Sequence, residues 1–212
     1  MCSRYYMEEN SKDLKPYVDR VKALPLSHRM VAAFAKPLRT DGEIKPTDIA
    51  PVIAPSWDRK LTVYPMLWGF TNPKEGGSPL FNCRVESAAA KPFWKEAWRK
   101  RRCVIPASYY FEWEHLKSSD GKTQPGQKFL FQPKGCTITY LAGLYRLEEK
   151  NGVKFPVFTV LTREAGESIR FIHDRMPVVL PRDAAKSWLD PEADPKEIVK
   201  QAFTDMYFDK AA

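Results

Sequence analysis

Apolar and polar residues alternate over several short stretches of the chain, and turn-forming residues separate these stretches. A period of two places successive side chains on opposite faces of a strand, so the pattern predicts β-structure. The stretches that fit are residues 61–70, 108–114, 128–132, 137–145, 155–161 and 176–180. Prolines interrupt residues 25–55, which we expect to form strands and loops, and Asn151-Gly152 predicts a hairpin turn.

Other segments favour helices. They are residues 11–24, 93–102, 163–171, 182–189 and 195–203. Within residues 93–102, Trp94 and Trp98 are four positions apart and therefore share one side of the predicted helix. Short strands dominate the pattern, so the sequence predicts an α+β fold in which a mostly antiparallel β-sheet carries peripheral helices.

The composition is ordinary for a globular protein of one domain or two small ones. Of the 212 residues, 43% are hydrophobic and 28% are charged, which excludes a disordered, collagen-like or coiled-coil chain. Lysine and arginine number 34 against 26 aspartates and glutamates, a formal net charge of +8. The basic excess indicates an anionic partner such as nucleic acid or membrane headgroups.

Neither a membrane-spanning stretch nor an apolar secretory segment is recognisable in the sequence. We therefore expect a cytoplasmic protein, or a nuclear one if the host has a nucleus, with no membrane partner. The cysteines are widely spaced, without a Cys-x-x-Cys pair, which argues against a zinc site or any other bound metal. Cys83, Cys103 and Cys136 are expected to be small buried side chains.

Cys2 differs from the other cysteines because of its position. Methionine aminopeptidases remove Met1 before a small residue, which would leave an α-amine beside a thiol at the start of the chain. The amine has a pKa of about 7.7 to 8.0 and the thiol has a pKa of about 8.5, so both are nucleophiles at neutral pH. With an aldehyde, the amine can form an imine that the thiol closes to a thiazolidine ring. The alternative is that the chain begins Met-Cys by chance.

Glu112 and His173 are the second candidate for chemistry. Glu112 lies on a predicted strand between aromatic residues, where burial would raise its pKa toward a range useful for proton transfer. His173 lies between a predicted helix and a strand. The alternatives are a structural salt bridge for Glu112 and a structural role for His173. His28 and His115 lie in polar segments and are less indicative of a site.

Two further segments could bind phosphate. Strand alternation would place Asn82, Arg84 and Glu86 on one face, where an amide and a guanidinium could hold a phosphate or a base edge. A salt-bridged strand surface explains the same residues equally well. The basic run at residues 99–102 could bind phosphates or act as a nuclear signal, although such runs are usually solvated helix faces.

Taken together, these motifs resemble the SRAP family, the SOS-response-associated peptidases. The resemblance spans residues 1 to about 190, and five motifs occur in the family's order. The motifs are Met1-Cys2-Ser3-Arg4, Trp68-Gly69-Phe70, Asn82-Cys83-Arg84-Val85-Glu86-Ser87, Phe111-Glu112-Trp113 and Ile172-His173-Asp174-Arg175-Met176-Pro177. The resemblance implies a single α+β domain over residues 1–212 around a barrel-like sheet. It also implies an abasic-site sensor that binds single-stranded DNA and crosslinks to it through Cys2.

The resemblance assigns catalytic roles to Cys2, Asn82, Glu112 and His173. Cys2 would be the nucleophile that forms the thiazolidine with the ring-opened deoxyribose, after autoproteolytic removal of Met1. Glu112 would move protons during imine formation and ring closure. His173 would open the sugar and assist release of the crosslink, and Asn82 would orient the N-terminus and the lesion.

Further residues would contact DNA according to the resemblance. They are Arg4, Pro46, Arg84, Thr162 and Arg175, with the three arginines expected to meet on one surface around the N-terminus. The chain departs from the family where residues 42–46 lack the usual Asn, so that only Pro46 carries over there. We expect no cofactor and a monomeric protein.

Two other functions remain open at the level of the sequence. An N-terminal-nucleophile cysteine hydrolase or peptidase would also use Cys2, but it would turn over an amide and would not need an aldehyde. A non-catalytic single-stranded DNA-binding protein would rely on lysine and arginine contacts alone, with an affinity that falls steeply as salt rises.

Overall fold

The computed structural model describes residues 2–117, 123–150 and 152–211. The described strands are β1 Arg4–Met7, β2 Gly42–Ile44, β3 Ile49–Pro55, β4 Leu61–Trp68, β5 Asn82–Arg84, β6 Arg102–Ala107, β7 Tyr109–Lys117, β8 Thr123–Gln132, β9 Thr139–Lys150, β10 Val153–Glu164, β11 Arg175–Pro177, β12 Val179–Leu180 and β13 Tyr207–Lys210. The described helices are α1 Lys15–Lys22, α2 Pro25–Phe34, α3 Val85–Ala88, α4 Pro92–Lys100, α5 Arg182–Trp188 and α6 Pro195–Val199.

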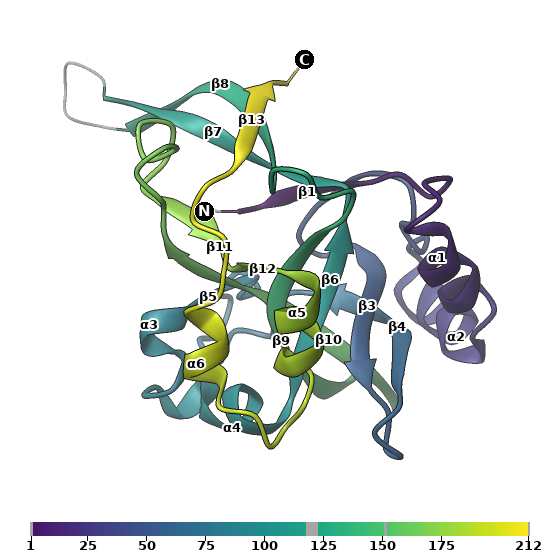
Figure 1. The fold of residues 1–212 in the computed structure, drawn as a ribbon. Coiled ribbons are helices and arrows are strands. Elements are labelled where there is room, and N and C mark those ends of the chain that lie inside the picture. The colour runs from purple at the N-terminus through teal and green to yellow at the C-terminus, as the bar shows by residue number, and fades with distance from the viewer. Residues whose placement is uncertain (1, 118–122, 151, 212) are drawn as a thin grey trace.

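The strands form a barrel and a second sheet that lies across one end of it (Figure 1). The barrel runs in the order β10-β4-β3-β6-β9 and closes because β9 pairs with both β6 and β10. The second sheet has the order β13-β8-β7-β1-β2. Pairing is antiparallel except where β10 meets β4 and β5. The prediction of an α+β fold with a barrel-like, mostly antiparallel sheet is confirmed.

Both faces of the barrel strands are buried, because strand alternation sorts their side chains into two hydrophobic clusters. In β3, for example, Ala50 and Val52 join one cluster while Ile49 and Ile53 join the other. The first cluster also holds Cys2 and side chains of the second sheet. The other includes Trp94, Trp98 and Trp188, through which α4 and α5 cover the barrel. The predicted shared side of Trp94 and Trp98 is therefore confirmed.

Three predicted elements are wrong in part. Residues 25–34, expected as strands and loops, form α2, in which Pro25 occupies the first turn where its missing N–H costs nothing. Residues 163–171 form no helix, because β10 continues to Glu164 and turns follow. Residues 176–180 are split between β11, which pairs with β10, and β12, which pairs with β9. The predicted Asn151-Gly152 turn includes Asn151, which lies outside the described residues.

A sharp bend at Gly69 carries the chain from β4 toward β5. Its φ of +125° is a conformation that favours glycine, and a Cβ there would lie 2.9 Å from the Cβ of Pro79. After the loop, β5 pairs with one side of the end of β10, and β11 pairs with the other side. The bend thus brings the Asn82 segment to the barrel end that β1 and β7 cover. Among the described residues, no helix is both long enough and apolar enough to cross a membrane.

Candidate functional site

Cys2 lies at the junction of the barrel and the second sheet. The strand that follows it, β1, is held between β2 and β7, with Tyr5 paired to Ile44 on one side and to Tyr110 on the other. Cys2 is fully buried, and the side-chain amide of Asn82 donates a hydrogen bond to its carbonyl oxygen over 2.8 Å. Burial raises the pKa of the Cys2 thiol well above its usual value, and the nearby Glu112 carboxylate raises it further.

Glu112 and His173 form a buried pair beside Cys2. Their side chains are 4% and 5% exposed, and Oε1 of Glu112 lies 3.6 Å from Nε2 of His173. Burial raises the pKa of Glu112 to about 7 and lowers the pKa of His173 to about 4. Near neutral pH, Glu112 can therefore give or take a proton while His173 stays uncharged, an arrangement typical of acid–base sites.

The contacts of His173 orient its ring. The backbone N–H of Arg175 donates to Nδ1 over 2.8 Å, so in the neutral ring the proton lies on Nε2, the nitrogen that faces Glu112. A carboxylate oxygen of Asp174 lies 2.9 Å from the same Nδ1.

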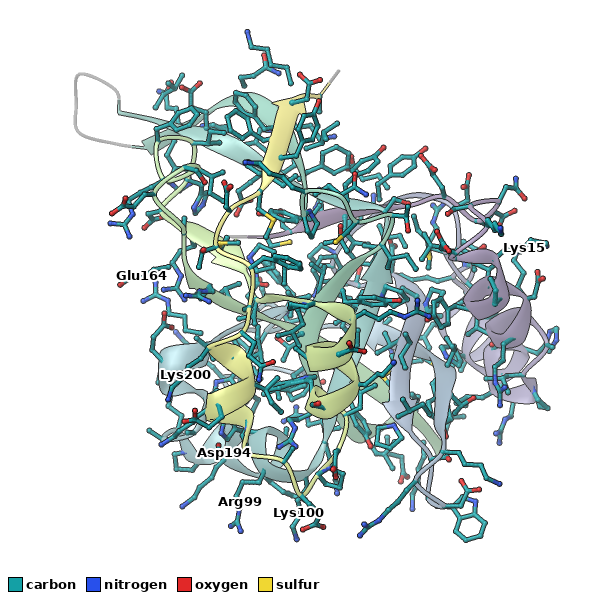
Figure 2. All side chains as sticks on the ribbon, viewed as in Figure 1. Lys15, Arg99, Lys100, Glu164, Asp194 and Lys200 are labelled. Atoms are coloured by element: carbon teal, nitrogen blue, oxygen red, sulfur yellow. The ribbon has the colours of Figure 1, made fainter. Side chains whose placement is uncertain are left out.

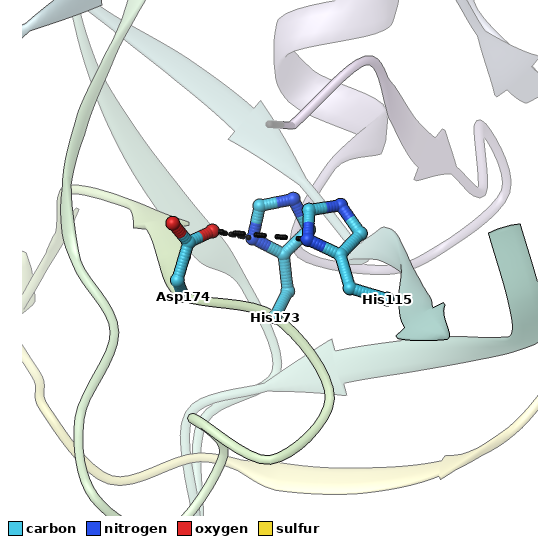
Figure 3. Close-up of side chains that lie close together, drawn as sticks. All are labelled: His115, His173 and Asp174. Carbon is cyan, nitrogen blue, oxygen red and sulfur yellow. Dashed lines mark ion pairs between the residues drawn. The ribbon is translucent and has the colours of Figure 1, made fainter. Parts of the chain in front are cut away.

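His115 is a residue of the site that the sequence analysis set aside. Its ring centroid lies 3.7 Å from that of His173, with the rings tilted by 46° (Figure 3). Its backbone N–H donates to the carbonyl of Ile172 over 2.9 Å, which ties β7 to the loop that carries His173. Regular alternation would place His115 and Glu112 on opposite faces, but the β7–β8 register shifts between Trp113 and His115. We find no sequence signal that predicts this contact.

A buried set of polar atoms surrounds Cys2. Within the described part of the chain, the Tyr5 and Tyr110 hydroxyls and Oδ1 of Asn82 have no hydrogen-bond partner. Burial raises the pKa of each tyrosine well above its ordinary value. Both tyrosines also interact electrostatically with Cys2. Such groups are rare in interiors unless a ligand, water or reaction uses them. The two tyrosines were not predicted as site residues.

Thr162 and Arg175 lie next to each other at the end of β10. Thr162 pairs with Arg84 on one side and Pro177 on the other, and Arg175 contacts the Thr162 hydroxyl at 3.5 Å. Arg175 also donates twice to Glu86, over 2.8 and 3.0 Å. Although burial opposes it, this pairing lowers the pKa of Glu86. The predicted shared strand face of Asn82, Arg84 and Glu86 is wrong, because β5 ends at Arg84 and α3 begins at the next residue.

Arg4 forms an ion pair on the second sheet. Its Nε donates to Glu43 over 3.0 Å, and Lys128 approaches the other oxygen of Glu43 at 2.6 Å. Pro46 lies in the turn at residues 45–48, where Thr47 has a φ of +73° and donates its N–H to Trp68. Among the described contacts, none joins Pro46 to Cys2, Glu112 or His173. Arg84 is exposed.

Other predicted residues lie away from this site. Cys83 and Cys103 are buried as predicted, while Cys136 is only partly buried. In the basic run at residues 99–102, Arg99 and Lys100 are exposed at the barrel end far from β7, whereas Arg102 is buried (Figure 2). A cavity of about 320 Å³ between α1 and α5, lined by Tyr17 and Val104 among others, includes none of the predicted site residues.

Comparison with known proteins places these residues in a family context. The family model described as SOS response associated peptidase (SRAP) matches residues 1–210. The chain is 33% identical over 130 residues to "Abasic site processing protein YoaM" of Bacillus subtilis, covering 59% of this chain and 55% of that protein. It is 32% identical over 140 residues to "Abasic site processing protein YedK" of Escherichia coli, covering 66% and 60%. The matches thus span somewhat more than half the length of these relatives.

Solved structures share the fold. A crystal structure of a protein from Bacteroides thetaiotaomicron matches with a TM-score of 0.74 and 19% identity, covering 100% of this chain and 92% of that one. A protein from Bordetella bronchiseptica matches with a TM-score of 0.69 and 20% identity, covering 100% of both chains. At these identities the likeness supports the fold alone.

Proposed function

Because the chain belongs to the SOS response associated peptidase (SRAP) family, we propose that it senses abasic sites in single-stranded DNA and crosslinks to them through Cys2. The observation that carries the proposal is the convergence of Asn82 and Glu112 on Cys2. The names of the relatives, which describe abasic site processing, agree with it. We further propose that the protein is a monomer whose single domain extends over residues 1–212 and which works in the cytoplasm, at the nucleoid, or in the nucleus of a eukaryote.

The reaction requires that removal of Met1 leave Cys2 with a free α-amine. The amine adds to C1′ of the ring-opened sugar, and loss of water gives an imine. The Cys2 sulfur then attacks the imine carbon while the thiol proton passes to the nitrogen, which closes the thiazolidine. Overall, one aldehyde and one aminothiol give one ring and one water, so no cofactor is consumed.

Proton transfer is the role we propose for Glu112 and His173. The Cys2 thiol is buried and holds its proton strongly, so a neighbouring base is needed to accept that proton. Glu112, with a pKa of about 7, can protonate the departing hydroxyl group during imine formation, then accept the thiol proton as a carboxylate and pass it to the ring nitrogen. His173, uncharged and 3.6 Å from Glu112, is the residue we propose to assist opening of the sugar. Asn82 would hold the Cys2 backbone in place.

Phosphate binding is the role we propose for Arg4, Arg84 and Arg175, with Thr162 and Pro46 lining the DNA path. Arg84 is exposed, so its guanidinium can contact a phosphate directly. Arg4 and Arg175 are paired with Glu43 and Glu86, which would hold their guanidinium groups in position. The net charge of +8 favours association with a polyanion.

The test mixes Met1-processed protein with single-stranded DNA that carries one abasic site and separates the products on a denaturing gel. We expect a shifted band with the unsubstituted chain and with Cys136→Ala, a control that replaces a partly buried cysteine outside the site, and none with Cys2→Ala. Cys2→Ser keeps the amine but lacks the thiol, so it should be trapped only when borohydride reduces the imine. Absence of a Cys2-dependent band would rule the proposal out.

The same samples separate the alternatives. Duplex DNA with the same lesion tests the proposed preference for single strands. Turnover of an amide substrate without any aldehyde would instead favour an N-terminal-nucleophile hydrolase. Equal binding by Cys2→Ala and the unsubstituted chain, with a steep salt dependence and no covalent product, would favour a non-catalytic DNA-binding protein.

A further inference from the structure

We propose that His115, His173 and Asp174 form a binding site for one divalent transition-metal cation of the zinc type. Their potential ligand atoms lie within 4.8 Å of one another, and Figure 3 shows the carboxylate directed toward the two neighbouring rings. Imidazole nitrogens and a carboxylate oxygen are ligands that zinc, nickel and cobalt accept. His115 and His173 come from strand β7 and a distant loop, so no ligand spacing in the sequence could indicate the site.

The distances suit a tetrahedral ion after small side-chain movements. Two ligands about 2.0–2.1 Å from such an ion lie about 3.3 Å from each other. Oδ1 of Asp174 is 2.9 Å from Nδ1 of His173 and 3.9 Å from Nδ1 of His115. The side chains of His115 and Asp174 are 43% and 75% exposed, so both can rotate to adjust without a change in the backbone.

One contact in the cluster favours an added positive charge. Because Nδ1 of His173 accepts the Arg175 N–H, it presents a lone pair, and the Asp174 oxygen 2.9 Å away also presents lone pairs. Two acceptors at that distance repel each other unless a proton or a metal cation lies between them. A bound ion would satisfy both and would take the Nδ1 lone pair in place of the Arg175 N–H.

The surroundings already orient the His173 ring for such an ion. Metal-bound histidines commonly direct their second ring nitrogen at a carboxylate, which fixes the tautomer and the ring angle. Here Nε2 of His173 faces Glu112 at 3.6 Å, which leaves Nδ1 on the side of His115 and Asp174. The hydrogen bond from the backbone N–H of His115 to the carbonyl of Ile172 holds the two ligand-bearing segments together.

An ion at this site would restrain His173 and would therefore slow crosslinking. This consequence rests on the proposed function, whereas binding of the ion does not. Binding is accordingly measured without DNA, so that failure of the metal site and failure of the crosslinking reaction give different results.

The experiment titrates the chelator-treated full chain with Zn²⁺ by calorimetry and with Co²⁺ by visible absorption. His115→Ala and Asp174→Asn remove exposed ligands, and His28→Ala removes an exposed histidine on α2 as the matched control. We expect one ion per chain for the unsubstituted protein and His28→Ala, and at least tenfold weaker binding for His115→Ala and Asp174→Asn. The ratio of crosslinking rates with and without Zn²⁺ should fall well below one only where the ion binds.

Three results would overturn the proposal. The first is no saturable binding up to millimolar Zn²⁺. The second is binding by His115→Ala as tight as that of the unsubstituted chain. The third is a thiolate-to-cobalt charge-transfer band in the near ultraviolet, because it would place the ion on a cysteine instead.

Discussion

Ionisable side chains are buried at both ends of the barrel, but the two ends differ in how far their buried polar groups are hydrogen-bonded. β6 begins at Arg102, and the chain continues from its other end into β7, which carries Glu112. Arg102 is 2% exposed and donates to backbone carbonyls of α4, of the end of α5 and of the segment that follows it. The accepting residues are Trp98, Arg99, Trp188, Asp190 and Ala193. At the other end, Glu112 and His173 form a buried pair, and the hydroxyls of Tyr5 and Tyr110 near Cys2 have no hydrogen-bond partner among the described residues.

The difference separates a structural site from a candidate reactive one. At Arg102, the guanidinium satisfies carbonyls that helix ends would leave orphaned, and its hydrogen bonds offset the cost of burial. At Glu112, burial is not fully offset, and the raised pKa reports that cost. Natural proteins retain costly buried groups mainly where they serve function. Four substitutions test this contrast.

Glu112→Gln should have the largest effect. It keeps the shape of the side chain but cannot accept a proton, so we expect crosslinking to slow by about 10³-fold, or about 4 kcal/mol. Its urea midpoint should not fall, because the substitution removes a buried ionisable group. Single-turnover gels and urea unfolding at neutral pH measure the two quantities. An unchanged rate together with a lower midpoint would make Glu112 structural.

Arg102→Met should show the opposite pattern, a loss of stability without a change in the crosslinking rate. Methionine fills similar volume but leaves the carbonyls without a donor, so we expect a loss of roughly 3 kcal/mol in the free energy of unfolding. The crosslinking rate per folded molecule should not change, since β6 separates Arg102 from Cys2. Arg99→Met, at an exposed position near the end of the preceding helix α4, is the control and should cost little. A stable Arg102→Met protein would contradict the structural assignment.

Asn82→Ala should have an intermediate effect on the reactive end. It deletes the hydrogen bond to the Cys2 carbonyl, and we expect about tenfold slower crosslinking, or about 1.4 kcal/mol. Cys2→Ala should remain inactive in the same background. If Asn82→Ala lowers stability but not the rate, the amide does not position Cys2.

Tyr110→Phe should give the smallest change. The ring keeps its stacking on Phe131, at 5.0 Å between centroids, while the hydroxyl without a described partner is removed. We expect stability to stay equal or rise by about 0.5–1 kcal/mol. The rate of crosslinking should fall a few-fold, because the hydroxyl lies near Cys2 and Glu112. A loss of stability of more than about 1 kcal/mol would show that the hydroxyl makes a hydrogen bond and would weaken the contrast with Arg102.

Local patterns predicted most of the elements but not their ends. The aromatic alternation around Glu112 and the helical spacing of Trp94 and Trp98 both reflect burial of one face, which the residues themselves encode. The helix at residues 25–34 was missed because prolines were interpreted as breaks, although Pro25 begins the helix. The predicted helix at 163–171 is wrong because β10 extends to Glu164, where it pairs with β11, and turns follow it.

The sequence by itself determined the fold class, the family motifs and the candidates Cys2, Asn82, Glu112 and His173. The fold class follows from local spacing, whereas the four candidate residues come from their chemical type and from the resemblance of their motifs to the SRAP family. Only the tertiary structure brought His115 against His173, paired Glu86 with Arg175, and turned one arginine of a basic run inward as Arg102. The reason is that strand register and chain reversals set which distant residues meet, and a single register shift or a bend at one glycine changes those contacts without changing the local pattern.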